Sequence, residues 1–271
     1  MLHSFIPPHR YFAYLSWAQV AEMDDKENVV IIQPVGAIEQ HGLHLPLAVD
    51  SVIALGVLGK ALEMLDSAVP AYSLPMLYYG KSNEHSSFVG TIALSATTLT
   101  NILTEMAESL YRSGFRKLVF FNAHGGQPQV LQIIARDLHV KYPDLMIFPL
   151  FVWNVPNAAA ELLSPKELAL GIHAGDAETS LMLTLLPEQV NMDRAVSEYP
   201  QGLPQDSSLS MEGMLPFAWS TQDLSKSGVI GDATVATTEK GDRLLETLSS
   251  GWIRTIKDIY KFKQPSTDSV S

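Results

Sequence analysis

The chain has 271 residues, and 46% of them are hydrophobic, which is enough for one large globular domain with a sizeable core. Its formal net charge of -11 argues against nucleic acid as a partner, because binding to a phosphate backbone needs clustered positive charge. It contains no cysteine, which excludes disulfides and thiolate catalysis and fits a reducing cytoplasm.

The beginning of the chain does not resemble a targeting segment. Pro7, Pro8, His9 and Arg10 stand where a signal peptide would need an apolar core. No apolar run approaches the roughly 20 residues that a membrane-spanning helix needs. We therefore expect a soluble, cytoplasmic protein that does not bind a membrane.

The first predicted elements are a short helix and a buried strand. Ser16 is a suitable cap for a helix over residues 16–23, and the apolar run 29–32 predicts a strand. Gly36, Gly42 and Pro46 then mark residues 33–50 as a loop.

This loop carries Glu39, His41, His44 and Asp50. Carboxylate oxygen and imidazole nitrogen suit Zn, Mn or Fe, and the absence of thiolate argues against a structural Cys-type zinc site. Each residue also has a purely structural interpretation: Asp50 could be only the N-cap of a helix that starts at Ser51, and Glu39 and His41 could be solvated loop residues. Because they occur together after a strand and among glycines, we predict a metal site.

The next segment should supply a helix over residues 51–65 and a strand over 68–78. A polar loop, 81–91, follows and contains a second acidic and imidazole pair, Glu84 and His85. Ser95 or Thr97 would cap a helix that runs to about residue 113, where Gly114 is a typical C-terminal stop.

A third predicted strand, 116–121, runs into a turn that contains His124, Gly125 and Gly126. No lysine follows these glycines, so the turn is not a phosphate-binding loop. The glycines allow the backbone to approach whatever lies at the end of the strand. We interpret His124 as a ligand that joins the first loop; the alternative is a capping histidine bonded to backbone. Pro128 fits the first turn of a helix over 128–140.

The second half of the chain begins with a predicted strand, 145–153, and a helix, 165–170. The polar cluster 171–179 then leads into an apolar helix over 180–186. Glu178 could be a first-turn glutamate favoured by the helix dipole, an interpretation that suits Asp176 even better. Alternatively, Glu178 is a general acid and base that takes the proton of an attacking water, as metal-assisted hydrolysis requires.

Strands that alternate with helices predict an α/β fold, here a single-domain α/β/α sandwich over residues 1–271 with a mostly parallel sheet. Residues 196–232 show little periodicity and are expected to form a functional loop or flap. A last helix should span 239–262, and 264–271 should be a flexible tail. Because ligands of such sheets lie outside the carboxyl ends of the strands, the clusters 39–50 and 122–127 should meet there, with 173–178 facing the same crevice.

Together these motifs resemble the creatininase (creatinine amidohydrolase) family over about residues 30–190. The resemblance rests on four separated motifs in the family's order: Glu39-x-His41-Gly42-x-His44-Leu45-Pro46, Asp50, Asn122-x-His124-Gly125-Gly126 and His173-Ala174-Gly175-x-x-Glu178-Thr179.

The resemblance implies two divalent metal ions per chain, with zinc expected first and manganese or iron as alternatives. It implies that Glu39 and His124 bind one metal and His41 the other, with Asp50 bridging both. Glu178 would complete the second metal's ligands or act as a proton shuttle. It also implies a homo-oligomer, commonly a hexamer, and a small-molecule substrate.

His173 would lie over the site, where it stabilises the oxyanion or protonates the departing nitrogen. His85 matches a further family segment and is expected to line the pocket and bind substrate with Gly125 and Gly126. A metal-bridging hydroxide would then hydrolyse a C–N bond of a small or cyclic amide.

Two departures make creatinine itself a doubtful substrate. Creatininase carries a Tyr-Glu pair, whose glutamate is a metal ligand, where this chain has Gly125 and Gly126. No tryptophan occurs between Glu161 and His173, where creatininase has an aromatic residue that encloses its substrate. The Gly-Gly form is similar to a formamide-cleaving deformylase and to the peptide-trimming member of mycofactocin maturation. A homologue that binds metal or ligand without catalysis is a further alternative.

Overall fold

The fold is built on a four-stranded, fully parallel sheet with the order β2-β1-β3-β4. The computed structural model describes residues 1–202 and 207–265. The strands of the sheet are β1 (Val30–Val35), β2 (Ala71–Ser73), β3 (Lys117–Asn122) and β4 (Met146–Phe151). The predicted α/β fold with a mostly parallel sheet is therefore confirmed.

The two faces of the sheet are buried in two different hydrophobic clusters. In β1, Val30 and Ile32 belong to one cluster, whereas Ile31 and Val35 belong to the other. The side chains of β3 alternate between the same two clusters. Side chains of a strand alternate between its faces, so a continuous apolar run is what a strand covered on both sides needs.

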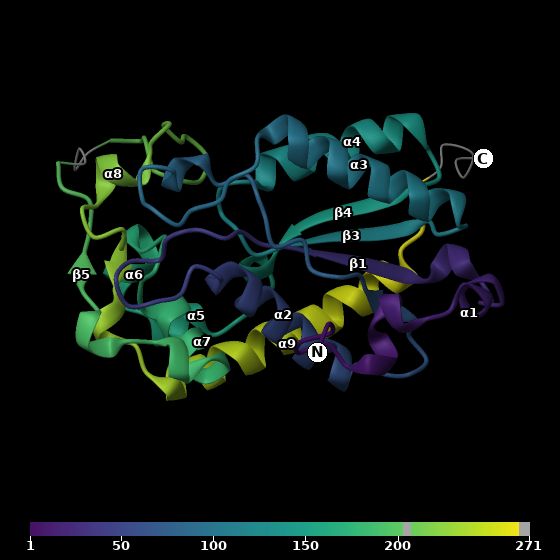
Figure 1. The fold of residues 1–271 in the computed structure, drawn as a ribbon, viewed down its shortest axis with the longest axis horizontal. Helices are drawn as coiled ribbons and strands as arrows, with labels where there is room; N and C mark the ends of the chain where they lie inside the picture. The colour runs from purple at the N-terminus through teal and green to yellow at the C-terminus, as the bar shows by residue number, and fades with distance from the viewer. Residues whose placement is uncertain (203–206, 266–271) are drawn as a thin grey trace.

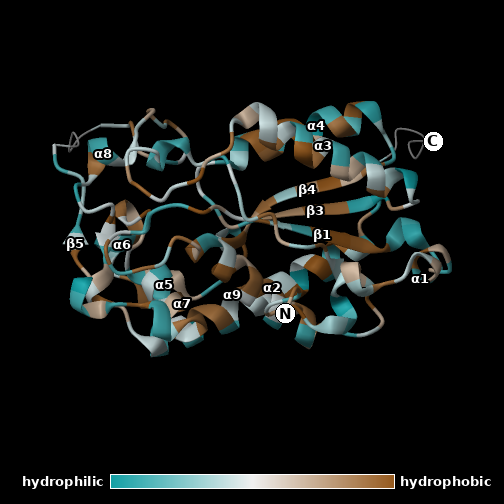
Figure 2. Ribbon diagram, viewed as in Figure 1, coloured by the Kyte–Doolittle hydropathy of each residue, from teal (hydrophilic) through white to brown (hydrophobic). Residues whose placement is uncertain are grey.

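Helices supply the two outer layers. In Figure 1, α3 (Ala96–Arg112) and α4 (Pro128–Lys141) cover one face, while α2 (Val49–Met64) and α9 (Thr238–Lys261) cover the other. Figure 2 shows the strands and the sheet-facing sides of the helices as the hydrophobic part of the molecule. The other α-helices of the described residues are α1 (Trp17–Ala21), α5 (Ala159–Leu162), α6 (Pro165–Leu170), α7 (Asp176–Leu185) and α8 (Thr221–Leu224).

Several predicted ends agree with the structure. Ser16 caps α1 in a capping box, Ser95 caps α3 by accepting a hydrogen bond from the Thr98 N–H, and Pro128 begins α4. α9 begins and ends within one residue of the predicted 239–262. Its Trp252 is fully buried and donates a hydrogen bond from Nε1 to the Val152 carbonyl at 2.9 Å.

Three predicted boundaries were wrong. β1 continues to Val35, three residues into the predicted loop. β2 covers only Ala71–Ser73 of the predicted 68–78, because Pro70 and Pro75 flank it and have no N–H for the sheet. α7 starts at Asp176 rather than at residue 180, which places Glu178 within its first turn.

α2 starts at Val49, with Ala48 at the cap position, so Asp50 lies in the first turn. The interpretation of Asp50 as only the N-cap of a helix beginning at Ser51 is therefore wrong. Asp50 is only 2% exposed although it carries a carboxylate.

The predicted irregular segment 196–232 contains three short elements among its described residues: β5 (Ser197–Glu198), α8 and β6 (Gly231–Asp232). β5 and β6 pair in an antiparallel ribbon. Residues 203–206 of this segment, and 266–271 of the predicted tail, lie outside the described residues. Within the described ranges, none of the helices has the length and apolar character needed to cross a bilayer.

Candidate metal centre

The predicted ligands meet at the carboxyl edge of the sheet. β1 and β3 pair in register up to Val35 and Asn122, so the loops that follow them leave the sheet side by side. Glu39 and His41 stand on the first loop and His124 on the second. Asp50 reaches the same place from the first turn of α2, and Glu178 from the first turn of α7.

The carboxylate of Asp50 lies between two imidazoles. One oxygen, Oδ1, is 3.5 Å from His41 Nε2, and the other, Oδ2, is 3.4 Å from His124 Nδ1. Glu39 Oε2 is 3.2 Å from the same His124 nitrogen. Glu178 Oε2 is 3.8 Å from His41 Nε2. Three sets of ligand atoms among the described residues are compact enough to hold a cation: Glu39, Asp50 and His124; His41, His173 and Glu178; and Glu39, His85 and His173. The third set shares Glu39 with the first and His173 with the second.

Two of these buried atoms have no hydrogen-bond partner in the described part of the chain: His41 Nε2 and Asp50 Oδ2. Leaving a buried polar atom unpaired costs free energy, so such atoms usually serve a ligand. Both atoms point into a cluster of carboxylate oxygens and imidazole nitrogens, the donor set of Zn and Mn sites. The residues therefore fit a divalent metal.

The charges in the cluster shift its pKa values strongly. Burial would lower the pKa of His41, but the nearby carboxylate of Asp50, with the charges of Glu178 and Glu39, raises it to about 9. Burial raises the pKa of Glu178 to about 7. Burial would raise the pKa of Asp50, but the two imidazoles beside it, His124 and His41, hold that pKa well below its usual value. The buried carboxylates thus favour positive charge beside them, which divalent cations would also supply.

His85 and His173 lie beside the cluster, and Gln40 fixes their orientation. The Gln40 side-chain amide donates to His85 Nδ1 at 2.8 Å. That nitrogen must then be unprotonated, so His85 carries its proton on Nε2, 3.4 Å from Glu39 Oε1. His173 Nε2 donates to the Gln40 carbonyl at 2.7 Å, which leaves Nδ1 as an acceptor 3.8 Å from Glu39 Oε1.

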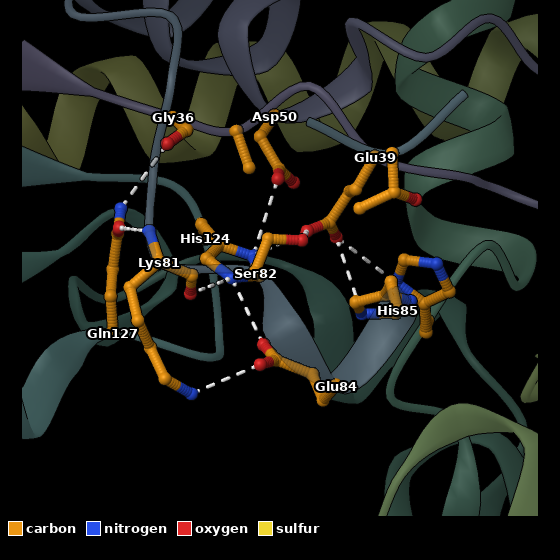
Figure 3. A network of polar contacts seen from close by, with 12 residues as sticks. Gly36, Glu39, Asp50, Lys81, Ser82, Glu84, His85, His124 and Gln127 are labelled. Atoms are coloured by element: carbon orange, nitrogen blue, oxygen red, sulfur yellow. Dashed lines mark hydrogen bonds and ion pairs between the residues drawn. The ribbon is translucent and has the colours of Figure 1, made fainter. Parts of the chain in front are cut away.

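Sequence reasoning did not assign Gln40 a role, although it stands between two predicted ligands. It also treated Glu84 only as the neighbour of His85. In Figure 3, Glu84 points at His124, and its Oε1 is 3.1 Å from Nε2 of that ring. Nε2 is also 3.0 Å from the Lys81 carbonyl. His124 therefore donates from Nε2 to the Lys81 carbonyl, with the Glu84 carboxylate beside that N–H, and presents Nδ1 to the cluster, the usual arrangement of a metal-binding histidine.

Further contacts hold the loops in place. Ser82 donates a hydrogen bond to Glu39 Oε2. His44 Nε2 is 2.8 Å from Thr179 Oγ1, so His44 joins the first loop to α7. The buried Glu167 accepts from the backbone N–H of Asp176 at 2.8 Å and of Asp232 at 3.0 Å. It thereby anchors the start of α7, a role that local sequence does not reveal.

A cavity of about 860 Å³ opens onto the cluster. The predicted site residues that line it are Glu39, Asp50, His85, His124, Gly125, Gly126, His173 and Glu178. His41 lies at the back of the cluster and is 1% exposed. The structure therefore brings together every residue singled out in the sequence for metal, catalysis or substrate.

Comparison with known proteins gives consistent matches. A mycofactocin precursor peptide peptidase of Mycolicibacterium smegmatis is 30% identical over 92% of this chain and 94% of its own. A creatinine amidohydrolase of Pseudomonas putida is 28% identical over 90% of this chain and 95% of its own. A creatininase structure of the Zn-Zn type superposes with a TM-score of 0.74 and 28% identity, covering 92% of this chain and 98% of that one.

The family model described as creatinine amidohydrolase matches residues 13–256, almost the whole chain. This match extends well beyond the four motifs, which lie between residues 39 and 179. The chain therefore belongs to the creatininase family.

Proposed function

We propose that this protein is a binuclear metal-dependent amidohydrolase that cleaves a C–N bond of an amide substrate. The observation that carries the proposal is the pair of unpartnered, buried atoms His41 Nε2 and Asp50 Oδ2 within a carboxylate and imidazole cluster at the end of a cavity. Both atoms lie 3.4–3.5 Å from an oppositely charged or imidazole neighbour but make no hydrogen bond, and a cation held between these groups would satisfy both of them.

Glu39 and His124 would hold one ion, His41 the other, and Asp50 would bridge them with one oxygen to each side. The spacing of Asp50 between the two imidazoles supports this assignment. Glu178 would complete the ligands of the ion at His41. Zinc is the first candidate, supported by a mutant creatininase structure of the Zn-Zn type. Manganese is an alternative that a creatininase structure with Mn supports, and iron is a further alternative.

Two cations bound there would polarise the amide carbonyl and acidify the attacking water. The residues of the chain would do the rest. Glu178, whose pKa is raised to about 7 by burial, is suited to accept the proton of that water and to return it to the departing nitrogen. His85 would donate a hydrogen bond from Nε2 into the site. His173 Nδ1 would accept from the substrate or complete the ligands.

A peptide-trimming reaction is the alternative within the same chemistry. It is supported by the 30% identity to a mycofactocin precursor peptide peptidase and by the size of the cavity. A small cyclic amide such as creatinine would fill only part of that cavity. A homo-oligomer, a hexamer by family resemblance, is part of the proposal and is tested by light scattering.

The first experiment is metal analysis by mass spectrometry on protein purified without chelator. We expect close to two metals per chain, and a sharp fall in Asp50→Ala. Asp193→Ala, which changes an exposed aspartate in a short turn, is the matched control and should keep both metals. No metal in the wild type, even after loading with zinc or manganese, would overturn the proposal in favour of a ligand-binding protein.

A further inference from the structure

Glu167 is a buried carboxylate on α6 that is hydrogen-bonded by three other segments of the chain. It is 4% exposed, and none of the ligand sets found among the described residues includes it. Its Oε1 accepts from the Asp176 N–H at 2.8 Å. Its Oε2 accepts from the Tyr199 hydroxyl at 2.7 Å and from the Asp232 N–H at 3.0 Å. Bonds from three separate donors hold the carboxylate in one position, because an unpaired buried donor would cost free energy.

Three glycines make room for this carboxylate. A Cβ added to Gly175 would overlap Glu167 Oε1, and one added to Gly231 would lie 2.7 Å from the same oxygen. One added to Gly171 would lie 2.5 Å from Glu167 Cδ. The backbone of the loop before α7 and the backbone of β6 are therefore packed directly against Glu167. Because a close-packed interior leaves little room for a shift, the carboxylate fixes how these two segments lie against each other.

The loop before α7 ends in a constrained turn. Gly175 caps α7 and Asp176 is its first residue, so the Asp176 N–H is one of the donors that a helix leaves without an internal partner. Glu167 supplies that partner, with the negative charge that a helix N-terminus favours. Ala174 has a left-handed φ of +53°, which a residue with a Cβ keeps only where the surrounding structure imposes it. Glu167 ties down the helical end of this turn.

The turn 173–175 directs the carboxylate of Glu178. The Ala174 N–H donates to Glu178 Oε2 at 2.6 Å. The same oxygen lies 3.8 Å from His41 Nε2. A shift of the Ala174 N–H would therefore move the oxygen of Glu178 that faces His41.

The other end of the turn is paired with the strand that Glu167 also binds. The Ile230 N–H donates to the His173 carbonyl at 2.8 Å, and the His173 N–H donates to the Ile230 carbonyl at 3.1 Å. Asp232, whose N–H donates to Glu167, lies two residues beyond Ile230. Glu167 thus holds both the helix that carries Glu178 and the strand that pairs with His173.

We propose that Glu167 is a positioning residue of the hydrolase, which fixes the turn 173–175 and thereby places the Glu178 carboxylate beside the ion at His41. This rests on the proposed function. Glu167 is not a metal ligand and acts through Glu178. The other ion of the pair, held mainly from the loops after β1 and β3, should not depend on it.

The test measures zinc binding to the whole protein by competition with a chelating indicator dye, which resolves the two ions. Glu167→Met removes both acceptors but keeps an unbranched side chain, and Gly175→Ala displaces the carboxylate from Asp176. In each variant one zinc should bind as in the wild type and the other about tenfold or more weakly, the usual effect of losing a group that orients a ligand. Tyr199→Phe removes only the hydroxyl bond, which does not reach α7, and should keep both affinities.

Thermal unfolding checks that each variant is folded at the titration temperature, and Gly175→Ala decides alone if Glu167→Met does not fold. A carboxylate that only stabilises the fold would lower the melting temperature and leave both zinc affinities unchanged, which would overturn the proposal. Equal weakening of both ions, or the same loss in Tyr199→Phe, would also overturn it, because the effect would then not pass through Glu178.

Failure of the proposed function is read separately, on metal-free protein. A proton–nitrogen NMR spectrum of alanine-labelled protein contains the Ala174 amide, identified by its loss in Ala174→Gly. A short bond to a carboxylate shifts this proton downfield, so it should move upfield in Glu167→Met and stay in place in Tyr199→Phe. If the wild type binds no zinc, the metal centre is wrong. An unchanged Ala174 signal in Glu167→Met would overturn the positioning role itself.

Discussion

The carboxylate of Glu84 fills the space that a side chain at Gly126 would need. A Cβ added to Gly126 would lie 1.5 Å from Glu84 Oε1 and 2.6 Å from His124 Nε2. Glycine at this position is therefore what allows Glu84 to reach the ring of His124. Burial would raise the pKa of Glu84, but the close contact with His124 and the charge of that ring lower it to about 2, so the carboxylate stays ionised there.

Gly126→Ala should weaken zinc binding about 10- to 100-fold, because displacing Glu84 removes the group that orients His124. The affinity is measured by competition with a chelating indicator dye. Gly125→Ala is the matched control, because the added Cβ would contact only Glu212 Oε1, at a van der Waals distance of 3.5 Å. If the two variants bind zinc equally well, Glu84 has no part in holding the ligand.

Glu178→Gln should keep the fold but lower turnover on the order of 10²–10⁴-fold, because glutamine cannot accept a proton. Turnover is followed on the amide that a substrate screen identifies, and metal content is measured on the same sample. Retained metal with lost turnover identifies a proton shuttle, and lost metal identifies a ligand. Glu188→Gln, exposed just beyond α7, should change neither, and near-normal turnover in Glu178→Gln would remove this residue from the mechanism.

Gln40 should fix the tautomer of His85, which long-range proton–nitrogen NMR of histidine-labelled protein reports directly. We expect His85 to carry its proton on Nε2. His139 is an internal reference with the opposite tautomer: it carries its proton on Nδ1, which donates to the Leu145 carbonyl at 3.0 Å.

Gln40→Glu should move the proton of His85 toward Nδ1, because a carboxylate accepts where the amide donates. His139 should not change in the same spectrum. A wild-type spectrum with His85 protonated on Nδ1 would contradict the proposed donor role of Nε2.

Glu198 should make stability depend on pH in the acid range. Its carboxylate accepts from the backbone N–H groups of Lys226 and Ser227 at 2.8 and 2.9 Å. Burial opposes these bonds, but they lower the pKa to about 2, below the usual value of about 4.3 in an unfolded chain. The stabilisation is therefore fully present above that unfolded value and is lost as the pH falls toward 2.

The measurement is the melting temperature at pH 7 and at pH 3 for the wild type and Glu198→Gln. The variant should lie below the wild type at pH 7, and the gap should narrow at pH 3. Glu63→Gln, exposed on α2, should show no such narrowing. A gap that does not depend on pH would mean that the charge of Glu198 contributes nothing.

Much of the fold was predictable because it is local. The apolar runs of β1 and β3 and the caps Ser16 and Ser95 each depend on a few neighbouring residues. Errors arose where sheet pairing decided the ends of an element. β2 is short because Pro70 and Pro75 bound it, and β1 is long because it pairs with β3 through Val35.

The sequence by itself determined which residues could bind metal, since Glu39, His41, Asp50 and His124 follow strands or begin helices in recognisable motifs. Only the tertiary structure decided how they are held. Gln40 meets His173 across 133 positions and Glu84 reaches His124 across a gap left by Gly126. Such contacts join segments that are remote in sequence, and only the packing of sheet and helices brings them together.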